Sequence, residues 1–119
     1  PTNSFWIDTF PGTPFPKLDR DITVDALIVG GGITGLTAAY LLLKNGLSVA
    51  VIDRGRVAYR ETGHTTAHIT YVTDERLSQL AKHFGRNHAQ AVWEAGASAM
   101  AKIQTIIAEE DIACELREV

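Results

Sequence analysis

Residues 24–55, VDALIVGGGITGLTAAYLLLKNGLSVAVIDRG, place three glycines directly after an apolar run, and this stretch constrains the fold more than any other. Residues 24–29 are nearly all apolar, as in a strand that is covered on both faces. Residues 33–44 have a helix former's composition and end at Asn45-Gly46, and residues 48–52 form a second apolar, β-branched run. Strand, glycine turn, helix and strand in this order predict a βαβ unit with a right-handed crossover.

The spacing Gly30-x-Gly32-x-x-Gly35, placed between a strand and a helix, is typical of a dinucleotide-binding turn. Gly30 permits the tight turn, Gly32 leaves the backbone amides accessible to a pyrophosphate, and Gly35 lets the helix lie close to the strands. The phosphates would face the unpaired N–H groups at the positive end of the helix dipole. The alternative is a glycine-rich turn that merely packs tightly.

An acid at the end of the second strand favours the dinucleotide. Asp53 follows Gly30 by 23 residues, at the position where a carboxylate can accept hydrogen bonds from ribose hydroxyls. Its charge would repel the 2′-phosphate of NADP. Ala39 lies one turn beyond Gly35 on the same helix face and is again small. FAD and NAD both remain open from these residues, because they share the same ADP half.

The N-terminal 22 residues are a polar lead-in arm, in which Pro11, Pro14 and Pro16 argue against a helix. Trp6 and Phe10 are expected to fasten this arm to the rest of the protein.

Helices are predicted to follow a loop over residues 56–73 that contains at most one short strand. The apolar spacing in residues 77–84 predicts a helix with Asp74 as its N-cap and Gly85 as its stop. A longer helix begins near Asn87, and its EAGASAMA stretch is small enough for a neighbouring backbone to approach closely. Residues 114–119 are expected to begin a strand.

Composition narrows the possible partners. The net charge of −3 provides no basic surface for nucleic acid. Cys114 is the single cysteine, so an intramolecular disulfide and a thiolate zinc site are excluded and a reducing compartment is favoured. The most apolar window, residues 26–43, is interrupted by glycines and fits a buried strand and helix better than a membrane span. A cytoplasmic protein is expected.

The segment DRGRVAYRETGHTTAHIT, residues 53–70, helps to distinguish FAD from NAD as the bound dinucleotide. With GGGITGLTAAYLL before it, the sequence resembles FAD-dependent oxidoreductases of the D-amino-acid oxidase type, which include glycine oxidase and sarcosine oxidase-like enzymes. TGHTTAHIT is similar to bacterial members that carry a Rieske iron–sulfur domain after the flavin domain. Many relatives have Glu in place of Asp53, and they often place a glycine where this chain has Ile69-Thr70.

The resemblance implies an α/β fold: the N-terminal βαβ unit of a Rossmann-like, glutathione-reductase-like FAD-binding domain, followed by helices. It implies FAD as the cofactor, with the three glycines of the motif on the pyrophosphate, Asp53 on the adenosine ribose and Arg54 beside the adenine end. Thr65 and Thr66 would lie near the pyrophosphate or the flavin. The predicted cofactor-binding residues are Gly30, Gly31, Gly32, Ile33, Thr34, Gly35, Asp53, Arg54, Gly63, His64, Thr65 and Thr66.

Two histidines in this region have alternative interpretations. His64 and His68 are spaced as a helical metal pair would be, but the surrounding glycine and threonines favour loop or strand and no third ligand stands nearby, so no metal site is predicted. Some members of the family attach FAD covalently through a histidine here. Packing or hydrogen bonding near the cofactor is the preferred role for both.

The family's flavin domain is discontinuous, so the chain is expected to be a fragment of a longer polypeptide, with catalytic residues beyond residue 119. The expected organisation is an arm over residues 1–22, a dinucleotide-binding unit over 23–73 and a helical segment over 74–119. A [2Fe–2S] cluster would belong to a C-terminal domain absent from this chain. The preferred function is flavin-dependent oxidation of an amine or amino acid; the alternatives are an NAD-binding dehydrogenase segment and a nucleotide-binding module without chemistry.

Overall fold

A computed structural model describes residues 3–10 and 12–117 of the chain. Contacts within the chain divide it into two compact units, Pro1–Thr66 and Ala67–Val119. The first contains the sheet, and the second contains two consecutive helices.

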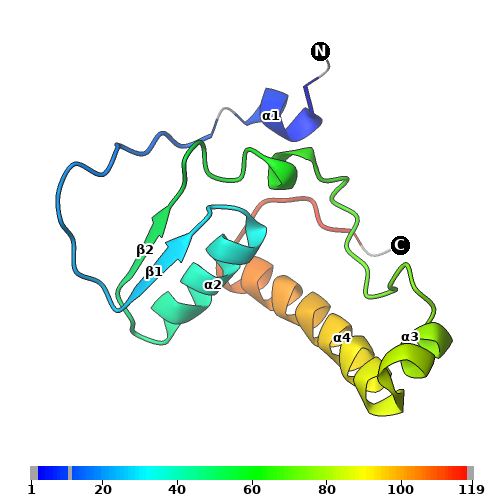
Figure 1. Cartoon of the computed structure of the whole chain (residues 1–119). Coiled ribbons are helices and arrows are strands. Elements are labelled where there is room, and N and C mark those ends of the chain that lie inside the picture. Colours follow the sequence, from blue (N-terminus) through cyan, green and yellow to red (C-terminus); the bar gives the residue numbers. More distant parts are fainter. Residues whose placement is uncertain (1–2, 11, 118–119) are drawn as a thin grey trace. The chain divides into compact units, whose positions relative to one another are not determined.

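The first unit is built on a parallel two-stranded sheet. Strand β1 (Ala26–Val29) pairs with β2 (Val49–Ile52), in a register that sets Ala26 opposite Val49 and Val29 opposite Ile52. Helix α2 (Ile33–Lys44) connects the strands and packs against both of them (Figure 1). The predicted βαβ unit is therefore confirmed, and the structure has the α/β class that the sequence predicts.

The ends of α2 are those predicted from the sequence. Within the helix, Ala39 is only 6% exposed, so the small residue on this face is buried. Beyond Lys44, the side-chain amide of Asn45 donates to the carbonyl oxygen of Leu41 at 2.8 Å. Gly46 then adopts a φ of 81°, a left-handed conformation that suits glycine and stops the helix.

A polar link joins the starts of the two strands, and the sequence analysis did not anticipate it. The carboxylate oxygen Oδ2 of Asp25 accepts hydrogen bonds from the backbone N–H and the hydroxyl of Ser48, at 2.8 and 2.6 Å. The backbone N–H of Asp25 donates to the Ser48 side chain at 3.0 Å. The bonds from the Ser48 side chain and backbone lower the pKa of Asp25 from its ordinary value of 3.8.

The lead-in arm contains a helix that the prolines were expected to prevent. Helix α1 spans Phe5–Thr9, ahead of Pro11, and Ser4 caps it by accepting a hydrogen bond from the Ile7 N–H. The prolines restrict only the residues around themselves, so the prediction for this part of the arm is wrong. Pro11 itself lies outside the described residues. Phe10 is 66% exposed and does not fasten the arm, whereas Trp6 does, as described below.

The loop after β2 contains one short element, the 3₁₀ helix η1 (Glu61–His64). Residues 56–73 form no strand in the described structure. The one short strand that the sequence allowed in this segment is therefore not formed, and the only regular element that the structure describes there is η1.

The second unit is a pair of packed helices, α3 (Leu77–Phe84) and α4 (Arg86–Glu109). Gly85 separates them with a φ of 88°, as predicted. The predicted N-cap is wrong: Arg76, not Asp74, precedes the first helical residue. Residues 114–117 form no strand, and residues 118–119 of that prediction lie outside the described residues.

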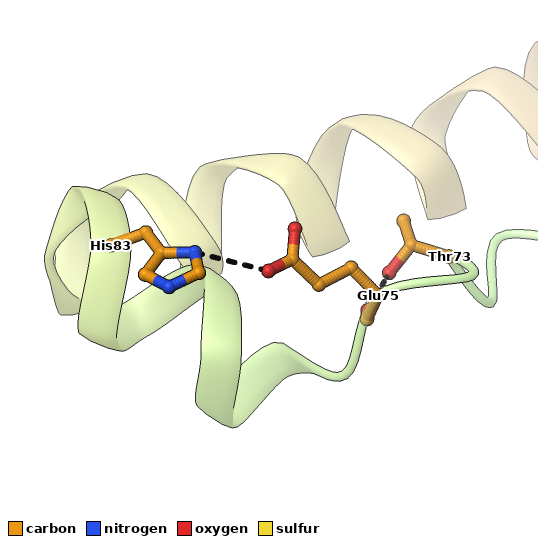
Figure 2. Close-up of polar contacts among 3 residues, drawn as sticks. All are labelled: Thr73, Glu75 and His83. Carbon is orange, nitrogen blue, oxygen red and sulfur yellow. Dashed lines mark hydrogen bonds and ion pairs between the residues drawn. The ribbon is translucent and has the colours of Figure 1, made fainter.

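The start of α3 is fastened to its last turn. Figure 2 shows the His83 ring facing the Glu75 carboxylate, with Nδ1 3.1 Å from Oε1, and the Thr73 hydroxyl donating to the Glu75 carbonyl oxygen at 2.6 Å.

On α4, a Cβ at Gly96 would lie 2.8 Å from the Cβ of Tyr71. The close approach predicted for the small-residue stretch is therefore present. Across the described ranges, no helix has both the length and the apolarity needed to cross a membrane.

Candidate dinucleotide-binding site

The N-terminus of α2 is formed by a turn that leaves β1 and enters the helix within three glycines. Gly30 has a φ of 111°, which is readily available only to glycine, and its N–H donates to the Ile52 carbonyl oxygen at 2.8 Å. Gly32 is the N-cap of α2 and offers no side chain to cap it. In the described structure, the backbone N–H groups of Gly32 and Thr34 have no hydrogen-bond partner. These are the amides that an anion at a helix N-terminus would use.

Asp53 lies against this turn and uses both carboxylate oxygens. Oδ2 accepts a hydrogen bond from the Gly31 N–H at 2.8 Å, and Oδ1 accepts one from the Gly55 N–H at 2.7 Å. The bonds from Gly31 and then Gly55 lower the pKa of Asp53 below its ordinary 3.8, and the positive charges of Arg60 and Arg54 lower it further. The group is therefore ionised at neutral pH. A carboxylate oxygen has a second lone pair, so each can also accept a ribose hydroxyl.

Two further glycine positions leave little or no room for a side chain. A Cβ at Gly35 would overlap the carbonyl oxygen of Gly30 and lie 3.1 Å from Cγ2 of Ile28, so α2 approaches β1 as closely as the motif predicts. A Cβ at Gly31 would lie 3.2 Å from Cγ2 of Val57. The next residue, Ala58, also holds the turn, because its N–H donates to the Gly31 carbonyl oxygen at 2.8 Å.

Thr62 is a residue of the site that the sequence analysis missed. Its Oγ1 accepts a hydrogen bond from the Ile33 N–H at 3.0 Å and would lie 3.2 Å from a Cβ at Gly32. The hydroxyl thus caps a helix whose own N-cap is a glycine, and it keeps its hydrogen to donate to an incoming oxygen. The sequence feature that could have indicated Thr62 is its position directly before Gly63, a predicted site residue that the structure shows to be buried.

The structure also describes the other predicted residues. Gly63 is buried in η1, where a Cβ would meet the Ala58 carbonyl oxygen at 2.9 Å. The exposed His64 ring places Nδ1 2.9 Å from the Arg60 carbonyl oxygen. The other predicted residues with exposed side chains are Ile33, Thr34, Arg54, Thr65 and Thr66.

The structure brings the glycine turn together with Asp53, and the hydroxyl that it places on the turn belongs to Thr62. His64 lies in η1 of the first unit, whereas His68 belongs to the second. The described residues contain no group of three His, Cys, Asp or Glu side chains arranged to hold a metal.

The glycine turn at the start of α2, together with Asp53 and Thr62, forms a cradle that fits the ADP half shared by FAD and NAD. Unpaired amides at a helix N-terminus suit a pyrophosphate, and an ionised carboxylate beside them suits a ribose. The family of FAD dependent oxidoreductases has a sequence model that matches residues 25–119. The chain belongs to the FAD-dependent oxidoreductase family. FAD is the cofactor of this family, and every element of the cradle lies within the matched residues.

Individual relatives of this flavoprotein chain agree with the family match. YhfW of Bacillus subtilis (strain 168), which is named as a Rieske 2Fe-2S iron-sulfur protein, is 39% identical over 112 residues, which is 94% of this chain and 22% of YhfW. Gamma-glutamylputrescine oxidoreductase of Escherichia coli (strain K12) is 30% identical over 77 residues, 65% of this chain and 18% of that enzyme. Flavin-containing amine oxidase B of Rattus norvegicus is 39% identical over 71 residues, with 51% and 14% covered.

The flavoprotein chain spans about a fifth of the length of the first two of these relatives. No solved structure matches it significantly. The resemblance to the D-amino-acid oxidase type and to a Rieske-named bacterial protein is confirmed by the family match and by YhfW.

Proposed function

We propose that this chain is the FAD-binding segment of an oxidoreductase that oxidises a small amine or amino acid, with residues 23–73 as the dinucleotide-binding unit. The observation that carries the proposal is the position of the ionised Asp53 carboxylate, bonded to Gly31 beside the unpaired amides at the start of α2. A pyrophosphate and a ribose carry the groups that these two features recognise.

In this proposal the amides of Gly32 and Thr34 bind the pyrophosphate, and Gly30, Gly31 and Gly35 let the backbone reach it. Thr62 adds a hydroxyl donor at the same helix end. Asp53 accepts hydrogen bonds from the adenosine ribose, with Arg54 beside the adenine.

The remaining members of the proposed site are Ile33 in the first turn of α2 and the flavin-side residues of the following loop, namely Gly63, His64, Thr65 and Thr66. Bound FAD supplies a hydride acceptor at its isoalloxazine ring, and the protein supplies orientation and electrostatics.

The substrate class is inferred from the names of the relatives. One is a gamma-glutamylputrescine oxidoreductase and another is a flavin-containing amine oxidase, and both names describe amine donors. The substrate-binding site would be completed by residues of the full-length protein outside these 119. A [2Fe–2S] cluster in a further domain of that protein is proposed from the name of YhfW, and a cytoplasmic location from the composition.

The proposal is tested first by the visible absorption spectrum of the full-length protein, taken before and after acid precipitation. Flavin bands that move to the supernatant support non-covalent FAD, and bands that stay in the pellet support a covalent bond to a histidine such as His64. A colourless protein that binds NAD would refute the FAD proposal in favour of the dehydrogenase alternative. Anaerobic bleaching of the flavin bands by an amine or amino acid, with recovery in air, then separates an enzyme from a binding module.

A further inference from the structure

Helix α1 is fastened to η1 by contacts that we name the N-terminal clasp: Ser4, Trp6 and Ile7 on the arm, and Gly63 and Thr65 on the loop. The Ser4 hydroxyl donates to the Gly63 carbonyl oxygen, and the Trp6 indole N–H donates to the Thr65 carbonyl oxygen at 2.8 Å. A Cβ at Gly63 would lie 3.3 Å from Cγ1 of Ile7, so Gly63 allows the arm to approach the loop closely. Residues 59 positions apart are thereby held together.

Neither side of the clasp has the means to be stable by itself. Helix α1 has five residues and none of them is buried, while isolated helices shorter than about 12 residues are marginal in water. The 3₁₀ helix η1 has four residues and one buried glycine. Ser4 serves both sides at once, because its Oγ accepts from the Ile7 N–H of α1 and donates to Gly63 of η1. The order of each segment therefore depends on the other.

The clasp continues to the start of α2 through one residue. Thr62, which directly precedes Gly63, places its Oγ1 3.0 Å from the Ile33 N–H. The arm thus holds η1, and η1 holds a hydroxyl at the helix end where the pyrophosphate is proposed to bind. The described hydrogen bonds of the Ser4 and Trp6 side chains go to Ile7 of the arm and to Gly63 and Thr65 of the loop, and none of them goes to the glycine turn.

We propose that Ser4 and Trp6 are positioning residues for the cofactor, acting through η1 on Thr62. The inference rests on the proposed function, and it adds the N-terminal arm to the FAD site. If the clasp opens, the population of chains with Thr62 in place falls, and the apparent affinity for FAD falls in the same proportion. Linkage requires the reverse effect as well: FAD must stabilise the clasp by the factor by which the clasp strengthens FAD binding.

The first test uses the full-length protein, stripped of cofactor and titrated with FAD. Trp6→Phe keeps an aromatic ring and removes the indole N–H, and we expect the dissociation constant for FAD to rise about three- to tenfold, the effect of one net hydrogen bond. Trp93→Phe is a matched control: Trp93 is 39% exposed against 41% for Trp6, and each makes one edge-to-face aromatic contact. The control is expected to bind FAD as the wild type does.

A second pair of variants guards against misfolding. Ser4→Ala removes the bridging hydroxyl and is expected to weaken FAD binding, whereas Ser4→Thr keeps the hydroxyl and restores it. The reciprocal effect is measured by hydrogen exchange in the peptide covering residues 4–10. If Ser4 and Trp6 had a merely structural role, FAD would not change the exchange rate of this peptide. FAD is expected to slow this exchange in the wild type and to slow it less in Trp6→Phe.

The outcomes separate the two proposals. A wild-type protein that binds no FAD overturns the proposed function and the clasp together. A wild-type protein that binds FAD, with equal affinity in Trp6→Phe and Ser4→Ala and with no effect of FAD on exchange in residues 4–10, overturns the clasp alone.

Discussion

Gly35 gives the sharpest prediction, because two opposing effects of one methyl group can be weighed. In a helix interior, Gly→Ala ordinarily stabilises a protein by about 0.5–1 kcal/mol. Here the new Cβ would overlap the Gly30 carbonyl oxygen and lie 3.1 Å from Ile28 Cγ2. Gly30 cannot easily retreat, since its N–H is bonded to the Ile52 carbonyl oxygen at 2.8 Å. Overpacking of this kind costs about 1–3 kcal/mol or more, so we expect Gly35→Ala to be destabilising by about 1–2 kcal/mol.

The measurement is the urea midpoint of the full-length protein, followed through the flavin signal and through far-ultraviolet circular dichroism. Gly55→Ala is the control, because a Cβ there would lie 3.7 Å from Asp53 Oδ1, an ordinary contact, and the N–H that bonds Asp53 is retained. Its midpoint is expected to stay close to that of the wild type. A Gly35→Ala protein that is as stable as the wild type would refute the close approach of α2 to β1.

Three further predictions concern polar side chains. Asp53→Asn is expected to weaken FAD binding about tenfold or more in titrations, because a charged acceptor for ribose is lost. The folded pKa of Asp53 is depressed below 3.8, so its contribution to stability is present above that pH and is lost as the pH falls further. Unfolding midpoints should therefore not respond to this residue between pH 5 and 8. Thr62→Val is expected to weaken FAD binding about three- to tenfold while Thr62→Ser retains it, and equal affinities in the two variants would count against a role for the hydroxyl. Asp25→Ala and Ser48→Ala should each lower the urea midpoint, and the double variant should lose little more than either, because both remove the same link between strands.

The parts of the fold that could be predicted from the sequence are those with local causes. Helix α2 begins and ends at the predicted residues because glycines precede it and Asn45-Gly46 follows it. The strands follow from two short apolar runs, and the position of Asp53 directly after the second strand follows from the spacing of the βαβ unit. Its hydrogen bond to Gly31 was not predicted.

The parts that were missed depend on partners distant in sequence. Ser4 meets Gly63, Asp25 meets Ser48, and Thr62 meets Ile33, and no local pattern marks these pairs. The helix α1 was missed because the prolines were assumed to prevent a helix throughout the arm, whereas they restrict only the residues next to them. Asp74 was expected to cap α3, but the helix begins later in the chain, after Arg76.

The two hydrogen bonds of Asp53 explain how one carboxylate can serve the fold and the proposed cofactor. Its oxygens bond Gly31 and Gly55, so the turn before α2 is fixed in the chain itself. A ligand that meets a turn already held in place loses less free energy to ordering it, and binds more tightly for the same contacts. The short side chain of Asp53 keeps the charge close to the backbone that it orders. We therefore expect the glycine turn to keep its conformation on FAD binding, and the larger response to fall on η1 and the N-terminal clasp, which have few buried contacts of their own.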